Sequence, residues 1–157
     1  MITTQEIVGL MVSDLAEISA SDLVKKCNDL GMKQVPYQDV GLDSNLPPFE
    51  AGHHFRFNLD GKEEVLFEIL EKDSLVLQTG YQLVLPAPLF FSKAKKRHRQ
   101  FEEILENYYG VGSVMKVGGI KITNYRNDTT IAYISRAKGA GYTDVITVRV
   151  GNRRFWG

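Results

Sequence analysis

The sequence contains a single cysteine, Cys27, among its 157 residues, so no intramolecular disulfide can form. It has no apolar run close to the roughly 18 to 20 residues that cross a bilayer, and its first residues lack the basic segment of a secretory signal. We therefore expect a cytoplasmic protein without membrane contact. A hydrophobic content of 43% argues against disorder. The length suits one hydrophobic core, which predicts a single domain over residues 1–157.

Motifs of metal sites and of common enzymes are also missing. His53 and His54 are adjacent, so in a strand they would point to opposite faces, and no second His or Cys stands at ligand spacing. No glycine pair has the third glycine or the strand-to-helix context of a nucleotide fingerprint. We therefore predict no metal and no cofactor, and we favour a protein that is not an enzyme. A small enzyme without a recognisable motif stays open, because paired carboxylates such as Glu102 and Glu106 leave no signature in sequence.

Two helices are predicted at the N-terminus. Thr3 and Glu6 have the spacing of a capping box, and apolar residues follow at helical intervals as far as residue 18. A second helix is expected to begin near Ser19 or Ser21 and to end at Gly31, because glycine suits the left-handed position after a helix.

The middle of the chain predicts three antiparallel strands. Asp60-Gly61 is a hairpin signal between two alternating stretches, residues 54–59 and 64–70, and a third strand is expected over 74–85. Residues 32–52 are predicted to form an ordered surface loop, because prolines and glycines interrupt any regular pattern there.

A long helix is then predicted from Ser92 to about Tyr109, followed by three more strands. The residues expected on its buried face are Phe101, Ile104, Leu105 and Tyr108. The strands are expected over 114–125, 130–137 and 143–150. The order ααβββαβββ predicts an α+β protein, with helices packed on one face of an antiparallel sheet made of two three-stranded meanders. The turns and spacings of the two meanders differ too much to establish a duplication.

Charge is distributed unevenly although the net charge is zero. Residues 1–90 contain six Lys/Arg and fourteen Asp/Glu, a net of −8, whereas residues 91–157 contain thirteen and five, a net of +8. Such asymmetry either is neutralised within the fold or indicates an electrostatic partner.

The acidic half suggests a binding function. Carboxylates can take the place of phosphates on a cationic partner and can steer its association. By analogy with small immunity proteins and inhibitors, we predict a non-enzymatic protein that binds another protein stoichiometrically, with a basic toxin or nuclease as the expected kind of partner. The predicted protein-binding residues are Asp39, Asp43, Asp60, Glu63 and Glu64.

The basic half suggests an alternative, a nucleic-acid-binding module. Its C-terminal strands interleave cations with aromatic rings, as in Tyr133 and Arg149 and in the tail Arg153-Arg154-Phe155-Trp156, a combination that binds single strands. The residues predicted to bind nucleic acid are Lys95, Lys96, Arg97, Arg99, Arg153 and Arg154.

The long helix poses a further question, because its cations come first in the stretch FSKAKKRHRQFEEILE, residues 91–106. A helix N-terminus carries partial positive charge, so this order is unfavourable. Either the acidic half of the chain lies against these cations, which we favour, or an external anion does.

Overall fold

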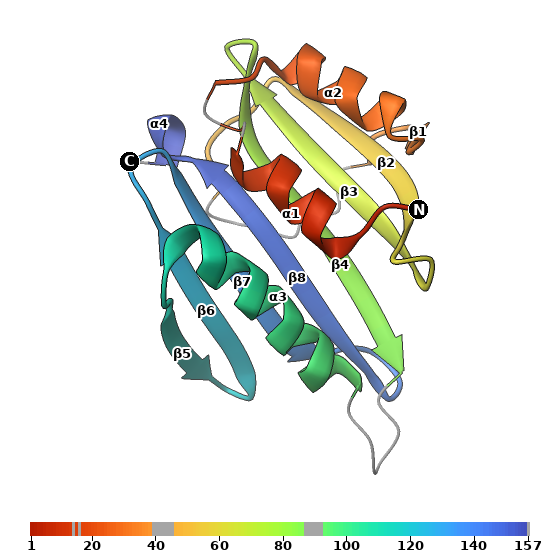
Figure 1. Ribbon diagram of the computed structural model, residues 1–157, viewed down its shortest axis with the longest axis vertical. Helices are drawn as coiled ribbons and strands as arrows, with labels where there is room; N and C mark the ends of the chain where they lie inside the picture. The colour runs from red at the N-terminus through yellow and green to blue at the C-terminus, as the bar shows by residue number, and fades with distance from the viewer. Residues whose placement is uncertain (14, 16, 39–45, 87–92, 157) are drawn as a thin grey trace.

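The computed structural model describes residues 1–13, 15, 17–38, 46–86 and 93–156. An eight-stranded antiparallel sheet runs through this part of the chain, and three helices lie side by side across one of its faces (Figure 1). The helices are α1 (Thr4–Ser13), α2 (Ala20–Asp29), α3 (Lys93–Tyr109) and the short α4 (Arg153–Trp156). The strands are β1 (Lys33–Val35), β2 (Ala51–Leu59), β3 (Glu63–Lys72), β4 (Leu75–Pro86), β5 (Ser113–Val117), β6 (Ile120–Arg126), β7 (Thr130–Lys138) and β8 (Thr143–Asn152).

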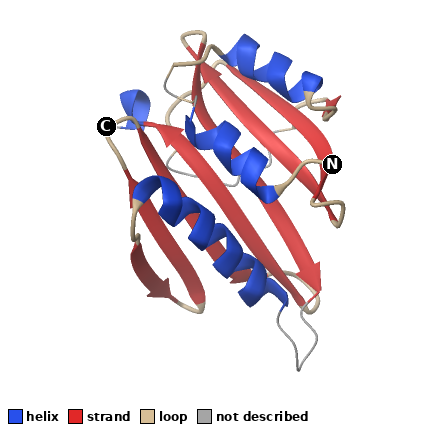
Figure 2. Ribbon diagram, viewed as in Figure 1, coloured by secondary structure: helices blue, strands red, loops and turns tan. Residues whose placement is uncertain are grey.

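The predicted α+β class is confirmed, and Figure 2 shows α1, α2 and α3 together in front of the sheet. Apolar residues of the helices and of the near side of the sheet form the core, with Phe55, Phe67 and Phe101 fully buried. We call the side of the sheet opposite α1, α2 and α3 the far face. Successive side chains of a strand point to opposite faces of a sheet, so every second residue of each strand lies on the far face.

Local sequence signals explain where the elements begin and turn. The capping box is present, since the Thr3 N–H donates to Glu6 Oε2 at 3.0 Å and the Glu6 N–H donates to Thr3 Oγ1 at 3.1 Å. Asp60 and Gly61 form the predicted turn, with positive φ of 53° and 67° and a 2.9 Å hydrogen bond from the Lys62 N–H to the Leu59 carbonyl. The connection is one residue longer than the predicted two-residue hairpin, because Leu59 pairs with Glu63. These short-range predictions hold because each depends only on neighbouring residues.

The predicted layout ααβββαβββ is wrong in detail, because the sheet has two more strands. β1 lies within the stretch predicted as loop, and it is only three residues long. The single strand predicted over 114–125 is a hairpin of β5 and β6, since Gly118 and Gly119 adopt φ values of 55° and 82° between them. Glycine tolerates this left-handed conformation, so the pair forms a turn rather than a bulge in one strand.

The ends of the helices also differ from the prediction. α1 ends at Ser13, earlier than the apolar pattern suggested. On α3, Phe101 and Leu105 are fully buried as predicted, but Tyr108 is 37% exposed. Its neighbour Tyr109 is the tyrosine that binds the sheet, through a 2.6 Å hydrogen bond to Thr130 Oγ1.

The two halves of the sheet share one topology. The strand order is β1-β2-β3-β4-β8-β7-β6-β5. In each half the four strands follow one another in chain order from the outer edge to the centre, β1 to β4 from one edge and β5 to β8 from the other. Each set of four strands follows a helix, α2 in the first half and α3 in the second, and each helix contacts the third strand of its own half. The halves meet where β4 pairs with β8, a relation that their unequal turns conceal in the sequence.

Candidate functional site

The first cations of α3 are partly neutralised inside the protein. The Arg97 guanidinium donates to both carboxylate oxygens of Glu63 at 3.0 Å and lies 2.9 Å from Asp60 Oδ2. Asp60 also accepts hydrogen bonds from the backbone and hydroxyl of Thr4, at 2.9 and 2.6 Å. Burial alone would raise the pKa of Asp60, but the bonds from Thr4 and Arg97 outweigh it and lower the pKa. For Arg97, the acidic half of the chain is therefore the counter-charge.

The predicted acidic contacts do not form one open patch among the described residues. The side chains of Asp60 and Glu63 are only 25% and 17% exposed, because they face Arg97. Glu64 is 62% exposed and pairs with Arg56 at 3.0 Å. Asp39 and Asp43 lie outside the described residues.

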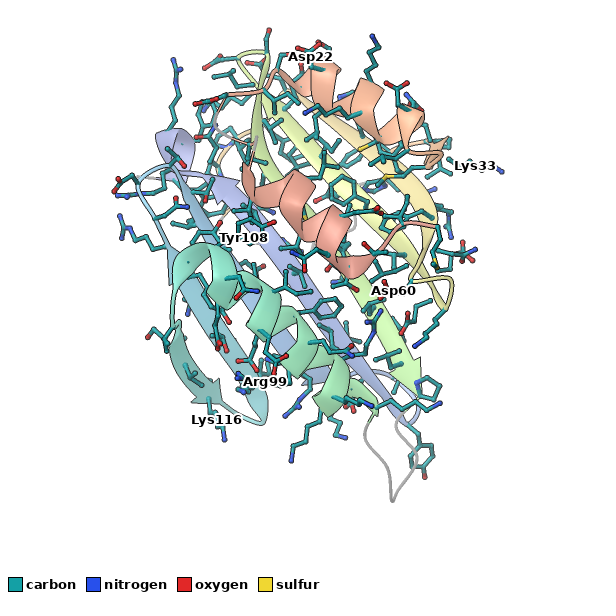
Figure 3. The ribbon with its side chains drawn as sticks, viewed as in Figure 1. Asp22, Lys33, Asp60, Arg99, Tyr108 and Lys116 are labelled. Carbon is teal, nitrogen blue, oxygen red and sulfur yellow. The ribbon has the colours of Figure 1, made fainter. Side chains whose placement is uncertain are left out.

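The predicted nucleic-acid contacts fall into two separate groups. Lys95, Lys96 and Arg99 are exposed on α3, and Arg99 lies 3.4 Å from Glu103 and 3.2 Å from Glu106. Figure 3 shows Arg99 on α3 and Asp60 beside the first turn of α1.

The second of these groups, Arg153 and Arg154, lies in α4. In Figure 1, α4 is at the opposite end of the sheet from the N-terminus of α3. Arg153 donates to the Asn127 carbonyl at 2.8 Å. The structure therefore does not bring the two groups of cations together into one surface.

His98 is buried between α3 and the sheet, with 1% of its surface exposed. Its Nε2 lies 3.6 Å from Glu102 Oε1, and neither ring nitrogen has a hydrogen-bond partner in the described part of the chain. Glu102 instead accepts from Lys121 at 3.3 Å and Thr123 at 3.0 Å. Desolvation lowers the pKa of His98 to about 4; Glu102 opposes this shift, and Lys121 and Arg136 add to it. The ring is therefore neutral at pH 7 and is enclosed by the core.

A row of polar side chains crosses the far face at a single register. From β2 to β6 the directly opposed residues are His54, Glu68, Gly80, Arg149, Tyr133 and Asn124. Gly80 provides room for Arg149, since a Cβ on Gly80 would lie 2.9 Å from Arg149 Cγ. Arg149 is only 8% exposed, and its guanidinium lies 6.0 Å from the centre of the Tyr133 ring. Arginine is seldom buried in this way, so the row marks a candidate site.

The histidine in this row is held in one orientation. The Gln38 N–H donates to His54 Nδ1 at 3.4 Å, and His54 Nε2 lies 2.9 Å from Glu68 Oε2. Because Nδ1 accepts, the ring proton is on Nε2 and is donated to Glu68. Both nitrogens are engaged, so the geometry suits positioning of the row and does not offer a base to a bound molecule.

Two hollows lie on either side of Arg149 on the far face. The smaller, about 170 Å³, is lined by His54, Glu68, Gln82 and Thr147 among others. The larger, which we call the groove, has a volume of about 510 Å³, within the range of ligand pockets. Its apolar walls are Met115, Ile120, Ile122, Ile131, Ala137 and Trp156, and its polar residues are Gln78, Asn124, Tyr133, Ser135 and Arg149.

The outer rim of the groove is exposed and apolar. Met115 and Val117 of the edge strand β5, which oppose Ile122 and Ile120 on the far face, are 48% and 57% exposed, and Ile120 is 40% exposed. Figure 3 labels Lys116 on this strand, at the margin of the sheet. Natural edge strands are usually short or charged, as β1 is here, so an apolar edge of this kind is a recognised sign of a binding surface.

The inner end of the groove contains buried donors. Gln78 is 3% exposed, and its Nε2 has no hydrogen-bond partner in the described part of the chain. The indole Nε1 of Trp156 is also buried and unpaired among those residues. Trp156 packs over the backbone of Gly151, which is the residue opposite Gln78. Buried polar atoms nearly always have partners, so two orphan donors in one groove need an explanation.

Sequence reasoning identified only part of this site. It singled out Tyr133, Arg149 and Trp156 as cations and aromatics of the C-terminal strands. It missed Gln78, because a polar residue inside a predicted strand gives no sign of the face on which it lies. It also missed the exposed edge, because the β5–β6 hairpin was predicted as a single strand.

Comparisons with other proteins add no assignment. A scan against models of protein families, a search of curated proteins and a search of solved structures each found no match. Within the described ranges, no helix is long and apolar enough to cross a membrane. In the same residues, no three His, Cys, Asp or Glu side chains are grouped so that they could hold a metal ion.

Proposed function

We propose that the protein is a non-enzymatic binding protein whose partner occupies the groove on the far face. The observation that carries this proposal is the coincidence of an exposed apolar rim on β5 and β6 with buried unpaired donors at the inner end. Burying the rim against a ligand would remove apolar surface from water, which favours association.

The side chains of the far face support binding more than catalysis. Both ring nitrogens of His54 are already engaged, and the Arg149 guanidinium is packed near Tyr133. Cys27 is no better a candidate nucleophile, because burial raises the pKa of its thiol to about 12. These groups can shape and orient a site without exchanging protons with a bound molecule.

Binding of a basic protein through an acidic surface has weaker support as a proposal. Recruitment of Asp60 and Glu63 by a partner would require them to separate from Arg97, and the exchange of one cation for another gains little. A nucleic-acid role for α3 rests on its exposed lysines, which lie far from Arg153 and Arg154.

The proposal is tested with the fluorescent dye 1-anilinonaphthalene-8-sulfonate, which brightens when it enters an apolar site. We expect the wild-type protein to brighten the dye and Met115→Glu to lose most of that signal, because a carboxylate would then stand on the groove wall. Val84→Glu is the matched control, since Val84 is 61% exposed on the far face but does not line the groove. Circular dichroism establishes that both variants are folded. Equal dye binding by Met115→Glu and wild type would refute the assignment.

A further inference from the structure

We infer that the groove binds an elongated apolar chain that ends in a carboxylate, as a fatty acid does, with the head group at Gln78 and Trp156. This inference rests on the proposed function and adds the chemical class of the ligand. Its starting point is the pair of donors, the Gln78 amide and the Trp156 indole, which are buried in the groove and unpaired among the described residues. A ligand atom that satisfied both would have to be a hydrogen-bond acceptor.

The charge around this end of the groove selects an anionic acceptor. Among the described residues that line the groove, Arg149 is the one charged side chain, and no Asp or Glu is among them. Arg149 lines the same groove and is 8% exposed, so water screens its field only weakly there. A carboxylate therefore fits better than a neutral carbonyl, and an ammonium head would be disfavoured.

The shape of the groove selects a chain as the body of the ligand. The lining residues extend from Met115 on β5, through Ile122 and Ile131, to Gln78 on β4. This path crosses five adjacent strands, a distance of roughly 19 Å at the usual strand spacing. The rim at the β5 end is apolar and exposed, so the tail would lie along it and cover it while the head stays at the inner end.

A peptide fits this path less well than an acyl chain. β6, β7 and β8 each pair with a strand on both sides, so their backbone groups are already used in the sheet. A peptide that crossed them would bury its own N–H and C=O groups against isoleucine side chains without partners, which is costly. An acyl chain has no such groups, and this difference decides between the two occupants.

The experiment compares three ligands with the same chain and different heads, dodecanoate, dodecanol and dodecylammonium, by calorimetry below their micelle concentrations. We expect wild type to bind dodecanoate roughly tenfold or more tightly than dodecanol, as a charge-assisted hydrogen bond in a buried site implies. Gln78→Leu and Trp156→Phe should each reduce this preference toward unity while dye binding is retained. Gln82→Leu is the matched control, because Gln82 lies on the same strand and face but lines the smaller hollow.

Each outcome separates the head-group inference from the proposed function. Equal affinity for dodecanoate and dodecanol, with dye still bound, would overturn the inference and leave the groove as a binding site. A preference for dodecanoate that survives both Gln78→Leu and Trp156→Phe would overturn the placement of the head. Tighter binding of an apolar peptide with a free C-terminus than of dodecanoate would overturn the choice of occupant. The dye experiment with Met115→Glu is separate and tests only the proposed function. Loss of dye binding supports that function, and retained dye binding contradicts it.

Discussion

Acid should destabilise the protein through His98, and the size of the effect follows from its surroundings. Burial lowers the pKa of His98 from an ordinary 6.5 to about 4. Between these two values the unfolded chain binds a proton that the folded chain does not, so stability falls as the pH falls through this window. From pH 7 to pH 5 the expected loss from this group is about 2 kcal/mol.

The variant His98→Leu removes the titrating group and fills nearly the same volume. It also removes two buried nitrogens that have no hydrogen-bond partner in the described part of the chain. Glu102 retains its bonds to Lys121 and Thr123. We therefore expect the variant to be at least as stable as wild type at pH 7, and to lose about 2 kcal/mol less than wild type between pH 7 and pH 5.

Urea unfolding at pH 7, 6 and 5, followed by circular dichroism, measures the effect for both proteins. Exposed carboxylates titrate equally in the two, so the difference between the pH profiles isolates the histidine. Parallel profiles would refute the reasoning, since they would mean that His98 takes up its proton in the folded state as easily as in the unfolded one.

The remaining predictions concern contacts that hold the fold. Arg97→Gln should cost about 2 to 4 kcal/mol in urea unfolding, because it leaves Asp60 and Glu63 without their cation. The matched change at the exposed Arg99, Arg99→Gln, should leave the stability nearly unchanged, and equal losses in the two variants would contradict an internal role for Arg97. Phe101→Ala should cost about 3 to 5 kcal/mol at the interface between helix and sheet, and a loss below about 1 would mean that α3 presents another face. Ser19→Ala should cost about 1 kcal/mol, because the Ser19 hydroxyl accepts from the Asp22 N–H at 3.2 Å, and rescue by Ser19→Asp would identify the cap as the cause.

The extent to which this fold follows from sequence depends on the range of the interactions. The capping box at Thr3 and Glu6 and the Asp60-Gly61 turn are set by residues within a few positions, and all were predicted. The three residues of β1 carry too few side chains to show an alternation, so β1 was predicted as loop. The pairing of β4 with β8 joins residues that are 57 to 73 positions apart, and no local pattern encodes it.

The candidate site was harder to predict than the fold for the same reason. The sequence shows Arg149 as a cation and Tyr133 as an aromatic residue. That the two residues lie directly opposite each other on β8 and β7 depends on the pairing register of these strands, which no local pattern gives. The burial of His98 was missed because five cations surround it in sequence, while in space α3 turns it toward Glu102 and Lys121. The partners of Arg97 are 34 and 37 residues away. The sequence therefore predicts that the acidic half lies against the cations of the helix, but it does not show which carboxylates pair with Arg97.

The shared topology of the two halves makes their chemical difference informative. In the first half the far face carries charged pairs, such as Arg56 with Glu64 and His54 with Glu68. In the second half the equivalent strands carry Ile122 and Ile131 around the groove. A far face that only contacts water is expected to be polar. The apolar surface of the second half therefore supports a binding role there.

The most direct test of this account is to map where dodecanoate binds, by titrating the isotope-labelled protein and following its backbone amide signals. The account predicts saturable shifts for Met115, Ile122, Tyr133 and Gly151, which surround the groove, and none for the hairpin at Asp60. Shifts confined to the hairpin and α3, or no saturable shifts at all, would contradict the claim that the far face is the binding surface.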